Sequence, residues 1–510
     1  MRVFKSAFLT VSVLVIGALP MQAMASAKEE AALRAIFTEM LDMYTDSYIP
    51  EGSALVQEGE MLIEDSGSYY SVTLPHLKYR GEKGYTDIGM IAINAVPEGN
   101  GKWKMTVALP TPIVAYDEKG NAVVSTSFGG QNFTGLYDEA IKYFTASKAV
   151  YRDIKISDPK KAVELNIAEA ALTHQMTEDK KDRWSGPMNM VLSGLSFAGP
   201  KGETGKIEKI ALTSSTTGYS FKEAQAYYDT LDAIDENYPE GEDMSSEHVI
   251  GIYNMITDFI GGALDGFDVG MAVTGVQFGD PSQAGEGLNS LTLGGAHFGF
   301  GMSGFRSGSV TMDYKMGYND IAMTPPQKGF DESTPQYLNL DISLMNLPYE
   351  ELTNLLKTSI EGSMQAPELG KVMGMQALLT LPQILTQAQT NLTIRHADIG
   401  NDLYDLTTTG KVVTDMAAQM GATGKARVTM RGLDALIAKL NQTAQDSSLD
   451  EMKSKKLQDL LAGLAILQMA GQIEKNDKGE EIRVYNFEAT KEGKVLLNGA
   501  DMSVFMGQPK

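Results

Sequence analysis

Residues 294–318 read GGAHFGFGMSGFRSGSVTMDYKMGY, and this stretch decides the fold that the sequence predicts. Large apolar residues alternate first with glycines and then, after Gly308, with polar or charged residues. A period of two is typical of a β-strand with one apolar and one polar side. We therefore predict two strands, each with an apolar side. The candidate residues for an apolar ligand face on these strands are Phe298, Phe300, Met302, Met312, Tyr314 and Met316.

Three glycines of this stretch, Gly299, Gly301 and Gly304, match the G-x-G-x-x-G pattern of dinucleotide-binding loops. Such a loop must follow a buried strand and open a helix, whose N-terminus holds the pyrophosphate. The residues after Gly304 alternate like a strand instead, so we predict no bound cofactor. The glycines are expected to lie in strands and turns, with their bare side against another backbone, a covering helix or a bound chain.

The period of two recurs over most of the chain. Residues 55–213 read as strands separated by turn-forming residues, and the pattern returns from Phe267 onward. Apolar residues at helical spacing predict helices at 28–48, 246–264, 346–362, 364–390, 432–442 and 449–473. We expect an interruption at Pro382 in the fourth, and one apolar face in the last, made by Leu460, Leu461, Leu464 and Leu467.

These patterns predict a β-rich α+β fold. Strand, turn and strand at short spacing favour a long, twisted, mostly antiparallel sheet, with amphipathic helices packed along it. A sheet of this length is expected to curve, because strands twist. The predicted organisation is a signal peptide over residues 1–27, a region over 28–247 that starts with a helix and ends in an acidic linker, and a second region over 248–510.

The first residues have the layout of a secretory signal peptide. Arg2 and Lys5 precede an apolar run over residues 6–19, Pro20 breaks the run, and small residues suited to cleavage follow. An uncleaved inner-membrane anchor is the alternative. With cleavage, no second apolar stretch long enough to span a membrane remains. The chain has no cysteine, as in many bacterial exported proteins that build a large core, so we predict a periplasmic location.

Charge and motifs narrow the classes of function. The formal net charge of −22 repels phosphate backbones, so nucleic acid is not an expected partner. No G-x-S-x-G motif is present, and the five histidines are far apart in sequence. We therefore predict no catalytic residues and no metal ligands, and a non-enzymatic protein.

The alternating apolar residues allow two interpretations. Their side of the sheet is either a filled core or a trough that holds an apolar ligand. The leading hypothesis is a cell-envelope protein that binds an apolar or lipid-like ligand or an envelope protein partner. The alternative is a structural or interaction scaffold with a filled core, and an envelope hydrolase with distant carboxylates is the least favoured.

Four segments near the C-terminus carry a resemblance. They read KARVTMRGLDALIAKLN (425–441), LQDLLAGLAILQMAG (457–471), IRVYNFEAT (482–490) and GKVLLNGADM (493–502). Their order resembles a family of uncharacterised exported alphaproteobacterial proteins, known as a domain of unknown function. The chain is also more loosely similar to AsmA-like periplasmic proteins, whose long curved sheets carry lipid, although those proteins keep an anchor. The resemblance implies an exported protein and supplies no catalytic residues.

Overall fold

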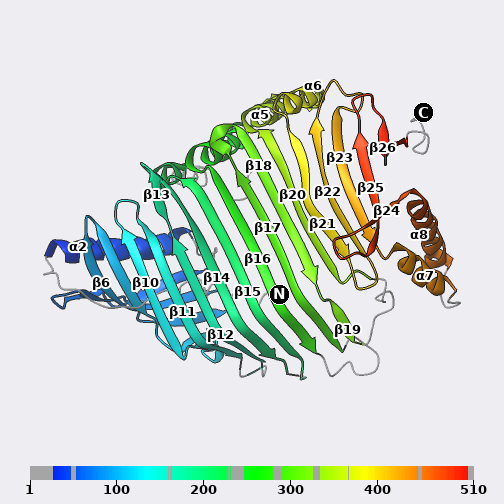
Figure 1. The fold of residues 1–510 in the computed structure, drawn as a ribbon. Helices are drawn as coiled ribbons and strands as arrows, with labels where there is room; N and C mark the ends of the chain where they lie inside the picture. The colour runs from blue at the N-terminus through cyan, green and yellow to red at the C-terminus, as the bar shows by residue number, and fades with distance from the viewer. Residues whose placement is uncertain are drawn as a thin grey trace. The chain divides into compact units, whose positions relative to one another are not determined.

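The computed structural model describes residues 27–47, 53–158, 160, 163–200, 202–227, 230, 246–279, 289–324, 334–365, 367–445 and 451–502 (Figure 1). The predicted signal peptide lies outside these residues apart from Ala27, and so does most of the predicted acidic linker. The chain forms two compact units. Unit 1 comprises Met1–Ser215 and Met271–Ser290, and unit 2 comprises Thr216–Gly270 and Leu291–Lys510.

Among the described residues, unit 1 contains one helix, which packs on an antiparallel sheet. Its elements are α2 (Ala27–Ser47), β1 (Ala54–Glu58), β2 (Leu62–Asp65), β3 (Tyr70–Thr73), β4 (His76–Gly81), β5 (Gly84–Gly89), β6 (Ala92–Gly99), β7 (Lys102–Ala108), β8 (Ile113–Asp117), β9 (Ala122–Ser127), β10 (Gly130–Asp138), β11 (Tyr143–Asp158), β12 (Val163–Gln175), β13 (Thr177–Lys180) and β14 (Arg183–Ala198). Three strands have residues in both units, namely β15 (Thr204–Tyr219), β16 (Gly266–Gly279) and β17 (Ser290–Ser303).

The sheet of unit 1 divides into two branches at β11. Residues 143–152 of β11 pair with β10, and the sheet continues from there through β7, β6, β3 and β2. Residues 155–157 pair with β9, and the sheet continues through β8, β5, β4 and β1. Asp153 lies between the two segments with a positive φ of 51°, at a break in the regular pairing with β12. The other edge of β11 pairs with β12, which pairs with β14.

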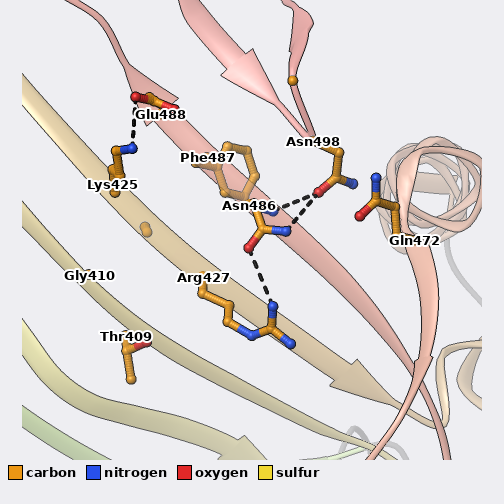
Figure 2. A pocket seen from close by; sticks show the side chains of 11 residues that line it. Thr409, Gly410, Lys425, Arg427, Gln472, Asn486, Phe487, Glu488 and Asn498 are labelled. Carbon is orange, nitrogen blue, oxygen red and sulfur yellow. Dashed lines mark hydrogen bonds and ion pairs between the residues drawn. The ribbon is translucent and has the colours of Figure 1, made fainter.

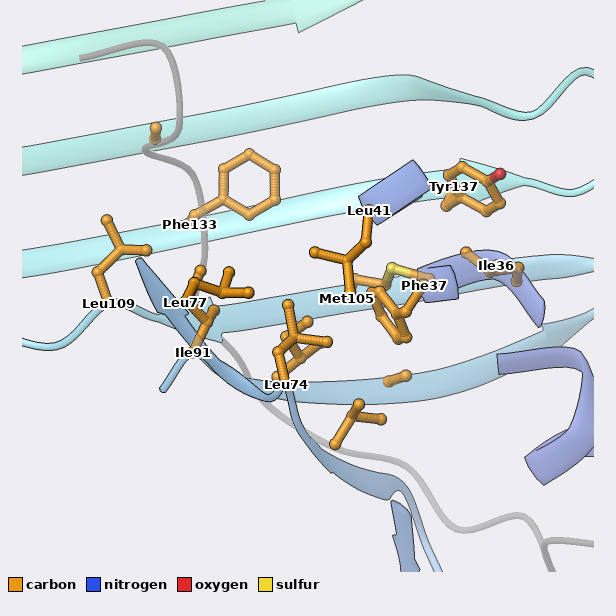
Figure 3. Packing of buried hydrophobic residues seen from close by; sticks show 14 of the residues in the cluster. Ile36, Phe37, Leu41, Leu74, Leu77, Ile91, Met105, Leu109, Phe133 and Tyr137 are labelled. Carbon is orange, nitrogen blue, oxygen red and sulfur yellow. The ribbon is translucent and has the colours of Figure 1, made fainter. Parts of the chain in front are cut away.

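The core of unit 1 joins α2 to both branches (Figure 3). The apolar residues of α2 recur every three or four positions, so Leu33, Ile36, Phe37 and Leu41 form one buried stripe. They pack in one cluster with the inward-facing residues of the strands, among them Met105. Unit 1 therefore has a filled core.

Among the residues that the structure describes, unit 2 combines antiparallel strands with five α-helices of 12 to 21 residues. Its elements are α4 (Ser246–Asp258), the π-helix η1 (Phe259–Ala263), the short 3₁₀-helix η3 (Phe305–Ser307), β18 (Ser309–Asn319), β19 (Ala322–Thr324), β20 (Tyr337–Pro348), α5 (Tyr349–Gln365), α6 (Pro367–Gln387), β21 (Asn391–Gly400), β22 (Asp405–Thr414), β23 (Ala422–Arg431), α7 (Leu433–Ala444), α8 (Glu451–Ala470), β24 (Gln472–Lys475), β25 (Glu481–Ala489), β26 (Val495–Leu497) and β27 (Ala500–Asp501).

The strands of unit 2 pair in the order β17, β18, β20, β21, β22, β23 and β25. The second edge of β25 pairs with β24 and then with β26. Helices α5 and α6 form the connection from β20 to β21 and lie at one end of the strands (Figure 1). Helices α7 and α8 form the connection from β23 to β24.

The predicted β-rich α+β fold on an antiparallel, curved sheet is confirmed, and the predicted helices are present with small shifts of their ends. Two details of the predicted helices were wrong. Helix α6 continues through Pro382, because the proline lies on an exposed side, where a carbonyl without its intrahelical donor can face solvent. Leu460 does not share the packed face of α8: it is 50% exposed, whereas Leu464 is buried.

Candidate apolar ligand face

The register of β17 and β18 brings the six predicted residues together. They form three directly opposed pairs, which are Phe298–Met316, Phe300–Tyr314 and Met302–Met312. The Phe298 and Tyr314 rings meet edge to face with centroids 5.6 Å apart, and the Tyr314 hydroxyl donates a hydrogen bond to Met316 Sδ at 3.0 Å. Because opposed residues share one face of a sheet, all six side chains lie on the same side.

Three further strands extend this apolar side. Met312, Tyr314 and Met316 of β18 stand opposite Leu344, Ile342 and Leu340 of β20. The next opposed residues are Leu392 and Ile394 of β21, followed by Val412 of β22. We call these twelve residues the open face: Phe298, Phe300, Met302, Met312, Tyr314, Met316, Leu340, Ile342, Leu344, Leu392, Ile394 and Val412. The six added residues follow the same period of two, but sequence alternation alone does not reveal which strands are neighbours.

The open face is not covered as a core is. None of its side chains is buried, and Phe298, Leu392 and Val412 are 42%, 41% and 46% exposed. By contrast, Leu33 and Val72 in the core of unit 1 are 0% exposed. The apolar side of an antiparallel sheet ordinarily packs against a second layer. A broad apolar surface that stays half-exposed is typical of a binding site.

The opposite side of the same strands is charged. Arg395 of β21 donates hydrogen bonds to Asp341 Oδ1 at 3.0 Å and to Asp313 Oδ1 at 2.5 Å, and its guanidinium also contacts the Ser343 hydroxyl. A β-bulge at Arg395 puts Arg395 and His396 together on the charged side, opposite Asp341. Ile394 stays on the apolar side, opposite Ile342. The sheet is therefore polar on one side and apolar on the other.

Gly299 and Gly301 of the opening motif belong to the charged side. Their strand, β17, is followed by the turn Gly304–Gly308 and then by β18, so the predicted strand and turn are confirmed. A Cβ added to Gly299 would lie 3.6 Å from Lys315 Cβ, and one added to Gly301 would lie 2.9 Å from Asp268 Oδ2. Backbone oxygens are also close: Val269 O lies 3.8 Å from the Cβ position of Gly299, and Phe267 O lies 3.4 Å from that of Gly301. The bare side therefore lies beside the backbone and side chains of neighbouring strands, and the atoms nearest to these two glycines do not belong to a helix.

One end of the apolar side is a filled core. Leu406, Val428, Met430 and Tyr485, on β22, β23 and β25, pack with Leu433, Leu436, Leu440 and Leu464 of α7 and α8. Arg483 lies on the same side and donates to Asp434 of α7 at 3.2 Å. The hydrogen bond from Gln468 and the interaction with Arg483 hold the pKa of Asp434 below its usual value. The open face therefore stops where this helix pair begins.

A polar hollow lies on the sheet near β22, β23 and β25 (Figure 2). Its volume is about 520 Å³, and it is open to solvent. Lys425 pairs with Glu488 at 3.0 Å, and Arg427 pairs with Glu474 at 2.8 Å. Since these charges are matched in pairs, the hollow offers no unsatisfied charge that would select an ionic ligand.

Asn498 occupies the gap that β24 and β26 leave along the edge of β25. Its Oδ1 accepts a hydrogen bond from the Asn486 amide nitrogen at 2.9 Å, and its Nδ2 donates to the carbonyls of Ala470 and Val484. These bonds replace a strand at this point. Asn498 is therefore a structural residue at the margin of the hollow.

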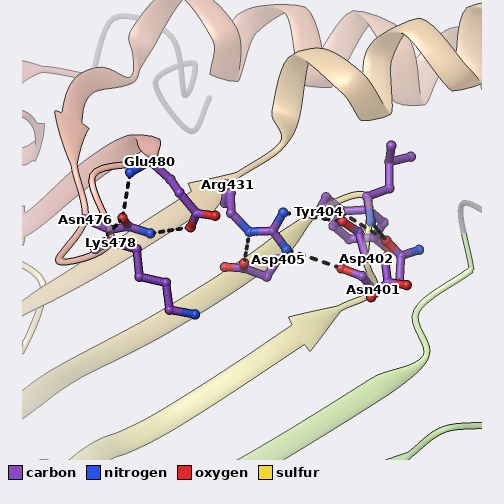
Figure 4. Close-up of polar contacts among 9 residues, drawn as sticks. Asn401, Asp402, Tyr404, Asp405, Arg431, Asn476, Lys478 and Glu480 are labelled. Carbon is purple, nitrogen blue, oxygen red and sulfur yellow. Dashed lines mark hydrogen bonds and ion pairs between the residues drawn. The ribbon is translucent and has the colours of Figure 1, made fainter.

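A polar cluster fixes the strand ends far from α5 and α6 (Figure 4). Arg431 donates to Asp405 Oδ2 at 2.6 Å and to the carbonyls of Asp402 and Asn401. The hydrogen bond with Asp405 raises the pKa of Arg431. The buried Asn401 side chain accepts hydrogen bonds from the Leu403 and Tyr404 amides. The partners are backbone groups and one carboxylate, which gives the cluster a structural role.

Two absences among the described residues bear on other kinds of site. No three His, Asp or Glu side chains among them are placed so that they could hold a metal ion. In the same part of the chain, no helix combines the length and the apolar character needed to cross a membrane.

Comparisons with known proteins give no relative. No protein-family model matches the chain, and neither the curated proteins nor the solved structures contain a significant match.

Proposed function

We propose that the open face binds an apolar, lipid-like ligand and that the protein is a non-enzymatic component of the cell envelope. One observation carries the proposal: none of the twelve apolar side chains on five neighbouring strands is buried and three of them are 41–46% exposed, while the other side of the same strands carries ion pairs. Burying such a surface against acyl chains removes apolar area from water, which stabilises a complex. Methionine and aromatic side chains suit ligands of varied shape.

The N-terminal sequence supports an exported protein. The basic residues, apolar run and small residues of positions 1–27 favour a cleaved signal and a periplasmic location over an anchored one. The resemblance to the exported alphaproteobacterial family and to AsmA-like proteins agrees with this location and with a lipid-like ligand, and stays part of the proposal.

The second candidate, a scaffold with a filled core, is favoured by unit 1. Its α2 and strand residues pack into one buried cluster. A scaffold does not need a half-exposed apolar surface in unit 2, so ligand binding distinguishes the two functions.

Titration with a fluorescent fatty acid tests the proposed function. We expect the full chain to bind the probe and Ile342→Lys, at the centre of the open face, to weaken binding at least about tenfold, because an ammonium group would have to be desolvated against the acyl chain. Thr409→Lys on the exposed, charged side of β22 is the matched control and should bind as the unmodified chain does. Equal binding by the Ile342 variant, or no binding at all, would contradict the proposal.

A further inference from the structure

Helix α6 carries a second apolar surface, separate from the open face. Val372, Met375, Leu378 and Leu379 are 61%, 67%, 70% and 75% exposed. At 100° per residue these four positions fall within about a third of the helix circumference. They therefore form a single outward stripe, which we call the α6 stripe.

The α6 stripe is connected to the open face through uncharged sequence. From Val372 to Ile394 the chain has no ionisable side chain, although the whole protein carries a net charge of −22. This segment contains the stripe and continues into Leu392 and Ile394 of β21. The Thr414 hydroxyl at the end of β22 donates to the Leu385 carbonyl of α6 at 2.9 Å, which holds the helix against the strand ends.

The hairpin of α5 and α6 is held in place by specific contacts. A Cβ at Gly362 would lie 2.1 Å from Met373 Sδ, and one at Gly370 would lie 2.4 Å from Ser363 Cα, so glycines allow the helices to approach closely. The Tyr253 hydroxyl of α4 donates to the Thr353 carbonyl of α5 at 2.5 Å. The stripe is thus displayed by a packed helix pair.

Charge and size indicate what the stripe contacts. Four side chains are too few for a stable protein interface, which buries roughly 20–30 residues a side. They suffice to insert into the surface of a bilayer, as interfacial helices do. Lys371 adjoins the stripe at its N-terminal end, but no Lys or Arg lies between residues 372 and 394, so the four apolar residues offer no cation of their own to lipid phosphates. The acidic protein as a whole is repelled by anionic lipid.

We infer that the α6 stripe inserts into the surface of an electrically neutral lipid bilayer. At this end of the strands the outermost row of the open face lies next to the helix pair, with Leu392 five residues after the end of α6 and 41% exposed. An apolar ligand can then pass between the bilayer and the open face without crossing charged surface. The transfer of a ligand to the open face rests on the proposed function, whereas the insertion of the α6 stripe does not.

A single cysteine tests insertion, because the chain contains none. Leu379→Cys is labelled with an environment-sensitive fluorophore, and Met469→Cys on α8, which is 81% exposed, is the matched control. With phosphatidylcholine vesicles we expect a blue shift and stronger emission from the label at 379, unchanged emission at 469, and a weaker response when anionic lipid is added. No response at 379 would overturn the inference. A response that depends on protein concentration without vesicles would instead assign the stripe to a second copy of the chain, which also overturns it.

Paired variants separate this inference from the proposed function. Leu378→Glu with Leu379→Glu should lower vesicle partitioning at least about tenfold and leave fatty-acid binding unchanged. Ile342→Lys should weaken fatty-acid binding and leave vesicle partitioning unchanged. If partitioning is unchanged in the α6 variant, insertion is wrong whatever the open face binds. If the unmodified chain inserts but binds no fatty acid, the proposed function fails alone.

Discussion

His174 is a titratable side chain packed into unit 1. It lies on β12 opposite Ser147 of β11 and Met188 of β14, and its ring meets the Tyr143 ring edge to face at 5.6 Å. Burial lowers the pKa of His174, because a charged imidazole would lose its hydration. Folding therefore favours the neutral ring.

The difference in proton binding between the folded and unfolded states determines how the free energy of unfolding depends on pH. An unfolded histidine binds a proton with a pKa near ~6.5, so below that pH the unfolded state holds more protons at this site than the folded state does. We expect the free energy of unfolding to fall between pH 7.5 and pH 5.5. The free energy of unfolding of His174→Phe, which keeps a ring beside Tyr143, should fall less over that pH interval, as measured by urea titrations. A variant with the slope of the unmodified chain would contradict this role.

At the scale of elements, close packing distinguishes two glycines of α6. Gly370 faces Ser363 of α5, whereas a Cβ at Gly374 would have no atom within 4 Å. A glycine in an exposed helix position costs about 0.5–1 kcal/mol relative to alanine. The same substitution should therefore have opposite effects at the two positions.

We expect Gly374→Ala to raise the free energy of unfolding by about 0.5–1 kcal/mol. Gly370→Ala should lower it by about 1–3 kcal/mol, since the added methyl group forces α5 and α6 apart. Urea unfolding followed by circular dichroism measures both changes. Stabilisation by both alanines would mean that the helix pair does not require the close approach.

The alternation of Phe298, Phe300 and Met302 was sufficient to predict a strand and its apolar side. It could not predict that Ile342 and Ile394 extend that side, because alternation fixes the face of a residue and not its partner strand. Helix continuity at Pro382 depended on its exposed position, which the sequence does not reveal. The α6 stripe was missed since an apolar helix reads the same whether its residues are packed or exposed.

At the scale of the whole molecule, the excess of acidic residues gives a net charge of −22 and hence self-repulsion that opposes the compact state. The Debye length shrinks from ~30 Å in 0.01 M salt to ~8 Å at 0.15 M, so added salt screens this repulsion. We expect the melting temperature to rise over that range of sodium chloride. An equal osmolality of sucrose serves as the control for effects other than screening, and a melting temperature that falls would contradict the expectation.

The two branches of unit 1 also determine the order in which the protein can be built. Along the chain, β1 belongs to one branch, β2 and β3 to the other, and β4 and β5 to the first again, an alternation that continues to β10. β11, which joins the branches, follows all ten strands. A chain that emerges N-terminus first must therefore hold α2 and these strands without their shared neighbour until residue 158 is available. Pairings between such distant residues form slowly, so unit 1 is expected to fold late and as one cooperative event.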